Sequence, residues 1–100
     1  MSLPVIFKPA AHLEFEEAVA WYEAQRSGLG EEFKREVKST LERALLNPEH
    51  FQHVRGRAQR IRLRRFKQYA IYFGIKEGTF AILAVFHGAR NPAELLRRLQ

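Results

Sequence analysis

The chain has 100 residues, of which 46% are hydrophobic and 12% aromatic, so it is expected to fold as one domain over residues 1–100 rather than remain disordered. It contains no cysteine, which excludes disulfides and thiolate catalysis and fits a reducing compartment, here the cytoplasm. No apolar run approaches the roughly 20 residues that a membrane span needs. The N-terminal stretch MSLPVIFKP is not typical of a signal peptide.

The formal net charge of +6 is divided unequally between the two halves of the chain. Residues 1–50 carry nine Glu and six Lys or Arg, a net −3, whereas residues 51–100 carry two Glu and eleven Lys or Arg, a net +9. Six arginines fall between Arg55 and Arg65. A field of this sign attracts phosphate or an acidic protein, so we expect it to serve a partner rather than the fold.

The first half of the chain predicts a short strand followed by two helices. Leu3 to Lys8 is apolar and β-branched, as in a strand. Helical spacing from Ala10 to Gln25 predicts a buried face made of Ala11, Phe15, Ala18 and Tyr22, with Glu14, Glu16, Glu17 and Glu23 mostly on the other faces. Glycines between Ser27 and Gly30 break this helix, and a second amphipathic helix ends at Asn47-Pro48.

The second half predicts three strands and a short helix. The first strand places Ile61 and Leu63 toward the helices and Arg60, Arg62 and Arg64 on the opposite face. YAIYFGI, from Tyr69, forms the next strand, and a turn at Glu77-Gly78 leads into a central strand, Thr79 to Phe86. This strand is either covered on both faces or has a second face that awaits a ligand. Residues 93–99 form a terminal helix. The fold class is therefore α+β, in which a helical hairpin packs on a mainly antiparallel sheet.

Three segments carry a resemblance to a known family. AVAWYEAQRSGLGEEF, IRLRRFKQYAIYF and ILAVFHGARNP together resemble the RelE/ParE toxin superfamily of bacterial type II toxin–antitoxin systems, in order and over nearly the whole chain. The resemblance implies a β-α-α-β-β-β(α) fold and growth arrest by the free toxin. It also implies a toxin–antitoxin hetero-oligomer, in which the C-terminal segment of a cognate antitoxin wraps the toxin.

Two targets occur in that superfamily, because RelE-like members cleave mRNA on the ribosome and ParE-like members inhibit DNA gyrase. Arg90 falls where the nuclease branch has a loop arginine, but Ala70 and Leu96 stand where it tends to have arginine and tyrosine. We therefore expect a ParE-like plasmid stabilisation toxin that inhibits gyrase and has no catalytic residues. The first alternative is an mRNA endonuclease that uses Arg65, His87 and Arg90, and the second is a non-toxic interaction module.

The residues expected to meet the antitoxin or the target are basic or aromatic and lie in the second half. The arginine stretch could be a solvated face, a nucleic-acid footprint or the docking surface of an acidic antitoxin. The last is favoured because the resemblance implies a groove for the antitoxin, and arginine also suits carboxylates. A structural role is favoured for His87, bonded to a backbone carbonyl, and for Arg90, paired with a glutamate. The complete expected set is Arg60, Arg62, Arg64, Arg65, Tyr72, His87, Arg90, Arg97 and Arg98.

No metal and no cofactor are expected. His50 and His53 lack a third ligand, so a metal site there is a weak hypothesis. Trp21 could stack a base, but we expect it to be a partly exposed residue of the helical hairpin, with Tyr22 in the core. The chain has no P-loop, dinucleotide fingerprint or nucleophile elbow.

Overall fold

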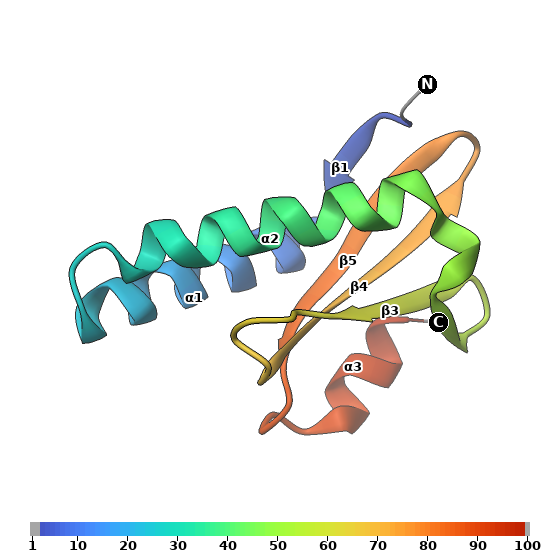
Figure 1. Ribbon diagram of the computed structural model, residues 1–100. Coiled ribbons are helices and arrows are strands. Elements are labelled where there is room, and N and C mark those ends of the chain that lie inside the picture. Colours follow the sequence, from blue (N-terminus) through green and yellow to red (C-terminus); the bar gives the residue numbers. More distant parts are fainter. Residues whose placement is uncertain (1–2, 100) are drawn as a thin grey trace.

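Two long helices cover one face of a five-stranded sheet, and a short third helix lies on the other face (Figure 1). The computed structural model describes residues 3–99. Met1, Ser2 and Gln100, which are part of the predicted domain, lie outside the described residues. The elements are β1 (Val5–Phe7), α1 (Pro9–Gln25), α2 (Leu29–Leu46), the 3-10 turn η1 (Pro48–His50), β2 (Gln52–Arg55), β3 (Ala58–Arg62), β4 (Tyr69–Lys76), β5 (Thr79–His87) and α3 (Pro92–Arg98).

The strands follow the spatial order β1-β5-β4-β3-β2. β1 pairs with β5 in parallel, and all other pairs are antiparallel, so the predicted α+β class with a mainly antiparallel sheet is confirmed. Strand β2 was not predicted, because its sequence QHVR contains one apolar residue and shows no alternation. It forms an antiparallel pair with β3 through a turn at Gly56, whose φ of 54° favours glycine.

The helical hairpin turns at Gly28, which has a φ of 90° and precedes the first residue of α2. The Glu23 carboxylate accepts hydrogen bonds from the backbone N–H groups of Gly28 and Gly30, which no helical carbonyl reaches. A Cβ atom at Gly30 would lie 2.9 Å from the carbonyl oxygen of Val19. Glycine at position 30 therefore lets α1 and α2 approach each other closely.

An aromatic cluster centred on Phe33 joins the helices to the sheet. The Phe33 ring stacks on Tyr22 at 5.2 Å between centroids and meets Phe66 and Tyr69 edge to face. Ile61 and Leu63 are buried in the same core, as predicted. Tyr22 is a core residue and Trp21 is 58% exposed, which agrees with the expectation for this pair.

A bulge at Leu83 reverses the alternation of β5. Tyr72 of β4 pairs with Ala84 and Phe73 pairs with Ile82, so Leu83 has no partner on β4. Before the bulge, Phe80 and Ile82 pack with the α1–α2 core; after it, Ala84 and Phe86 pack with Leu95 and Leu99 in the second apolar cluster. After the bulge the strand is covered on both faces, whereas Ala81 and Leu83 before it are only partly buried and line an open groove on the α3 side of the sheet.

Candidate functional site

Four of the expected interaction residues line one hollow on the α3 side of the sheet. Arg60 and Arg62 come from β3, Tyr72 from β4 and Arg90 from the loop after β5, around a volume of about 230 Å³. Tyr72 is buried, and the Arg90 guanidinium lies 4.6 Å from the centre of the Phe86 ring. We call this set of Arg60, Arg62, Tyr72 and Arg90 the arginine hollow.

The two strand arginines of this hollow differ in how they are held. Arg60 Nη2 donates to the side chain of Gln52 on β2 at 2.8 Å. Arg62 is exposed and forms no ion pair within residues 3–99. The guanidinium of Arg62 is therefore available to bind a carboxylate or a phosphate through two parallel hydrogen bonds.

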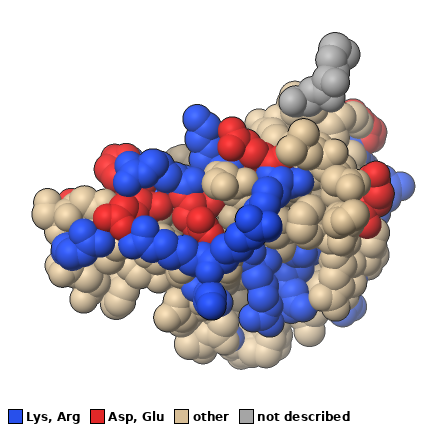
Figure 2. All heavy atoms as spheres, viewed as in Figure 1, with Lys and Arg blue, Asp and Glu red and all other residues tan. Residues whose placement is uncertain are grey.

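Arg64 and Arg65 lie beyond the end of β3 and do not line the arginine hollow, so the predicted alternation, which included Arg64, ends at Arg62. β3 ends at Arg62, and the chain then bends toward α2. The Arg65 backbone N–H donates to the Glu36 carboxylate at 2.8 Å, and its guanidinium pairs with Glu32. Burial lowers the pKa of Arg43 on α2, and the charge of Arg64 lowers it further. Figure 2 shows the resulting band of Lys and Arg side chains, with acidic side chains interleaved over α2.

Glu14 is buried near the candidate site, and the sequence did not predict this position. It was assigned to an outer face of α1, but it is 8% exposed and points at the open edge of β5 beyond β1. The Glu14 carboxylate accepts from the backbone N–H of Val85 at 3.0 Å, from Arg90 at 2.5 Å and from Arg98 at 2.7 Å. Its position three residues after Ala11 and four before Ala18 places it on the buried face, so the spacing could have revealed it.

Arg90 is held by two carboxylates, whereas the structural alternative for this residue predicted a single glutamate. It pairs with Glu14 and, within α3, with Glu94. Burial alone would lower the pKa of Arg90, but the hydrogen bond and charge of Glu14, with the charge of Glu94, raise it above its ordinary value. The two basic residues at the end of α3 also differ, because Arg98 binds Glu14 and Arg97 is exposed.

His87 lies at the end of β5 in a separate small hollow on the α1 side. This hollow is also lined by Glu17, Trp21, Tyr69 and Arg90. The expected bond to a backbone carbonyl is wrong, because His87 Nδ1 accepts the backbone N–H of Ala89 at 3.0 Å. Burial raises the pKa of Tyr69, whose ring meets His87 edge to face. His87 and Arg90 are thus neighbours, whereas Arg65 lines a different hollow with Glu32 and Glu36.

Residues 3–99 contain no group of three or more His, Cys, Asp or Glu arranged to hold a metal ion. His50 Nδ1 instead lies 3.0 Å from the side-chain nitrogen of Asn47, and His53 belongs to β2. Within the same described part of the chain, no helix is long and apolar enough to cross a membrane.

This arrangement of three helices on a five-stranded sheet matches a chain of a solved structure titled "Chromosomal ParDE TA system from P. aeruginosa". The TM-score is 0.69 with 10% sequence identity, over 86% of this chain and 96% of that chain. This likeness defines the fold class as ParE-like. The chain belongs to the family described as "ParE toxin of type II toxin-antitoxin system, parDE", whose model matches residues 5–92. No curated protein matches the chain. The predicted superfamily, its ParE-like branch and the toxin class are therefore confirmed.

Proposed function

We propose that this toxin is neutralised by a cognate acidic antitoxin and that, when free, it arrests growth by inhibiting DNA gyrase. Family membership over residues 5–92 carries the first part. The second part rests on the side chains that would have to perform RNA cleavage. Gyrase and its DNA substrate lie in the bacterial cytoplasm, so this proposal places the chain there.

Two positions where the nuclease branch tends to carry donors for RNA cleavage hold apolar residues in this chain. Such a reaction requires a base for the ribose hydroxyl, cations for the developing phosphorane charge and an acid for the leaving oxygen. Ala70 and Leu96 supply none of these groups. The Arg90 guanidinium is paired with Glu14 and Glu94. Arg65 is paired with Glu32 on α2 and does not face His87. These contacts favour action by binding over action by catalysis.

The arginine hollow supports docking of an acidic partner. Arg62 is exposed and forms no ion pair within the described residues, and Arg60 and the Tyr72 ring lie beside it. Arginine binds carboxylates through two parallel hydrogen bonds, which fixes orientation as well as strength. An antitoxin that fills this hollow would cover the surface that the toxin presents to its target. Arg64, Arg65, His87, Arg97 and Arg98 complete the proposed interaction set on the neighbouring surfaces.

Purified toxin added to a gyrase supercoiling reaction tests the target. We expect supercoiling to fall and cleaved DNA to accumulate, while mRNA in a translating extract stays intact by primer extension. Ribosome-dependent mRNA cuts with normal supercoiling would instead establish the endonuclease alternative. Normal growth after induction of folded toxin without antitoxin would contradict both gyrase inhibition and mRNA cleavage. The non-toxic interaction module would then be the remaining alternative.

Charge reversal in the hollow tests the antitoxin contact. Arg62→Glu should weaken antitoxin binding measured by calorimetry by about tenfold or more, as expected when a central charged contact is reversed. Folding stability should change by less than about 1 kcal/mol, because the side chain is exposed. Lys38→Glu, an exposed cation on α2, is the matched control. Equal antitoxin affinity for both variants would remove Arg62 from the docking surface.

A further inference from the structure

Strand β1 forms one edge of the sheet, and its outer side is open. Within residues 3–99, β5 is the single neighbour of β1. The backbone N–H of Lys8 donates to the carbonyl oxygen of Ile82 on β5 at 2.9 Å. Because backbone groups alternate in direction along a strand, Val5 and Phe7 each direct an N–H and a C=O away from β5. The outer side of β1 therefore offers two donors and two acceptors to another strand.

The other strand edges of this sheet are protected against such pairing. The opposite edge, β2, has an irregular register between His53 and Arg55 and carries exposed polar and charged side chains. Where β5 extends beyond β1, the side chains of Glu14 and Arg98 bind its backbone groups. Bulges, charges and covering side chains are the usual protection of edge strands against the addition of a further strand.

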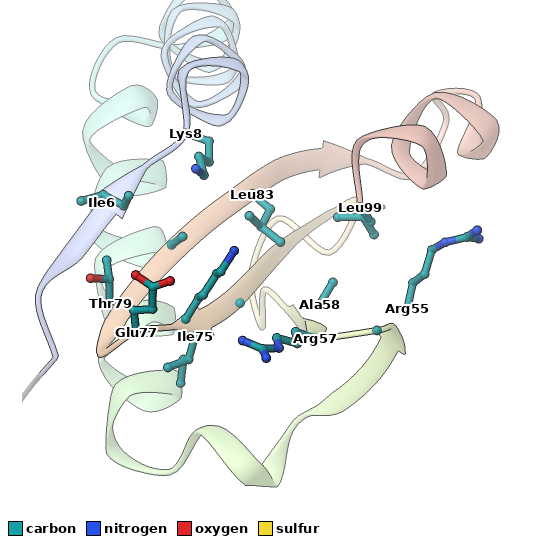
Figure 3. Close-up of a pocket in the computed structure, with 14 residues that line it drawn as sticks. Ile6, Lys8, Arg55, Arg57, Ala58, Ile75, Glu77, Thr79, Leu83 and Leu99 are labelled. Carbon is teal, nitrogen blue, oxygen red and sulfur yellow. The ribbon is translucent and has the colours of Figure 1, made fainter.

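β1 differs from these edges because its three residues are apolar and uncharged. Val5 and Ile6 are 40% and 45% exposed. Phe7 packs with the core under the helices, whereas Ile6 lines the groove on the α3 side of the sheet (Figure 3). Both sides of this edge thus present apolar surface next to free backbone groups, which is the combination that strand addition requires.

We propose that the outer edge of β1 binds the same edge of a second copy of this chain. A two-fold axis at Ile6 makes the two β1 strands antiparallel and places Val5 of each copy opposite Phe7 of the other. This register pairs all the outward groups of β1 in four hydrogen bonds. It joins the two sheets into one of ten strands, five from each copy.

A second copy suits this edge because the edge is complementary to itself. On the helical side of the joined sheet, Val5 meets Phe7 of the second copy. On the α3 side, Ile6 meets Ile6 of the second copy across the axis, at about 4.5 Å between Cα atoms. Each contact therefore joins apolar side chains, and cross-strand pairs of this kind stabilise a sheet.

Neither the helices nor the charges oppose this pairing. α1 packs on β5, and the two β5 strands would lie three strand spacings apart, about 14 Å. Two packed helices need only about 8–10 Å between their axes. Lys8 lies two residues from the axis, so the two Lys8 residues are separated by about 13 Å along the strands, beyond the screening length of about 8 Å at physiological salt. The arginine hollow contains no residue of β1 and stays open in both copies.

Val5→Pro tests the proposed hydrogen bonds. The Val5 N–H points away from β5, so proline removes an outward donor and leaves the pairing of β1 with β5 intact, as at other sheet edges. The wild-type chain alone should dimerise with rising concentration in sedimentation equilibrium. The variant loses two of the four bonds, one in each copy, so the dissociation constant of the dimer should rise about tenfold or more.

Ile6→Lys tests the apolar contact independently and serves if Val5→Pro does not fold. It places two cations opposite each other at the axis, so it should weaken the dimer by about tenfold or more. Leu46→Lys is the matched control, because Leu46 is an 87% exposed leucine at the end of α2 and lies outside the proposed interface. Leu46→Lys should dimerise like the wild type.

A cysteine at the axis tests the register. The chain contains no cysteine, so Ile6→Cys introduces a single thiol. A Cα separation of about 4.5 Å lies within the range of about 4.4–6.8 Å that a disulfide spans. Mild oxidation should therefore convert Ile6→Cys into a covalent dimer, while Leu46→Cys stays monomeric on a non-reducing gel.

The outcomes of these experiments do not depend on the proposed function, because they use the chain alone, without antitoxin or gyrase. A wild-type chain that stays monomeric up to millimolar concentration would overturn the proposal. A dimer that Val5→Pro and Ile6→Lys leave unchanged would also overturn it, because another surface would then join the copies. Loss of dimer in both variants, with efficient crosslinking of Ile6→Cys, supports the pairing of β1 with β1.

Discussion

Glu14 and Arg98 lie 84 positions apart in the sequence and share two hydrogen bonds, from Arg98 Nη1 at 2.7 Å and from Nη2 at 3.2 Å. Arg98 Nη2 also donates to the carbonyl oxygen of Leu83 at 2.6 Å. Glu14 and Arg98 thus form hydrogen bonds with the Val85 N–H and the Leu83 carbonyl, two backbone groups of β5 beyond the residues that pair with β1. The pair also connects α3 to α1. A helix of seven residues is not stable by itself, so α3 depends on this attachment and on Leu95 and Leu99.

Removal of the shared carboxylate is expected to destabilise the whole domain. Glu14→Ala leaves the N–H of Val85 without its acceptor and leaves Arg90 and Arg98 without their buried partner. We expect the free energy of unfolding to fall by about 2–4 kcal/mol, somewhat less than for a fully buried pair because both guanidinium groups stay partly exposed. Urea denaturation measures the change. Glu16→Ala, on the exposed face of α1, is the control, and equal midpoints for the two variants would contradict a structural role for Glu14.

Arg98 and Arg97 are expected to differ in their effect on α3. Arg98→Met removes the bonds to Glu14 and Leu83, whereas Arg97→Met alters an exposed side chain on the same helix. Hydrogen exchange of the α3 amides should therefore become about tenfold faster in Arg98→Met and stay near the wild-type rate in Arg97→Met. Similar exchange in both variants would show that Leu95 and Leu99 suffice to hold the helix.

Most of the fold could be predicted because its elements follow simple periodicities. Phe33 and Val37 mark the buried stripe of α2, and Ile71 and Phe73 mark the inner face of β4. Strand β2 escaped prediction because backbone pairing with β3, rather than apolar alternation, defines it. The bulge at Leu83 also escaped, because TFAILAVF is apolar at nearly every position and carries no sign of which face each residue takes.

The candidate site was predictable in composition and less so in arrangement. The arginine stretch identified a basic surface, but β3 ends at Arg62 and Arg65 binds Glu32 and Glu36 on the helical side. A strand end is set here by tertiary contacts such as the Arg65–Glu36 bond, which local sequence does not encode. A groove of about 820 Å³ on the α3 side of the sheet was not predicted (Figure 3). The small residues Gly74 and Ala81 line it, and they are neighbours only because of the register between β4 and β5.

Gly30 is expected to tolerate no side chain. A Cβ atom there would lie 2.9 Å from the carbonyl oxygen of Val19 and 3.2 Å from Glu23 Cβ, so α1 and α2 would have to move apart. Gly30→Ala should lower the free energy of unfolding by about 1–3 kcal/mol, despite the better helix propensity of alanine. Thermal denaturation measures the loss. Gly74→Ala, whose Cβ contacts are ordinary, is the control and should change the melting temperature little. A melting temperature of Gly30→Ala equal to that of the wild type would mean that the helical hairpin is loosely packed.

Acid should weaken the contacts around the start of α2. The N–H groups of Gly28 and Gly30 lower the pKa of Glu23, and hydrogen bonds from Arg65 and Arg26 lower the pKa of Glu32, both from the ordinary value of 4.5. A carboxyl group whose pKa is lower in the folded state binds fewer protons there than in the unfolded chain. Its contribution is therefore complete above about pH 4.5 and is lost as the pH falls through the folded-state value.

Glu23→Gln tests this dependence without changing the shape of the side chain. The variant should be less stable than the wild type at neutral pH, and the difference should shrink as the pH falls below 4.5, because the wild-type carboxylate becomes protonated. Urea midpoints from neutral to acid pH measure the two curves. Glu42→Gln is the control, since Glu42 is exposed and forms no ion pair within residues 3–99. Parallel curves for wild type and Glu23→Gln would show that the carboxylate charge does not stabilise the turn between α1 and α2.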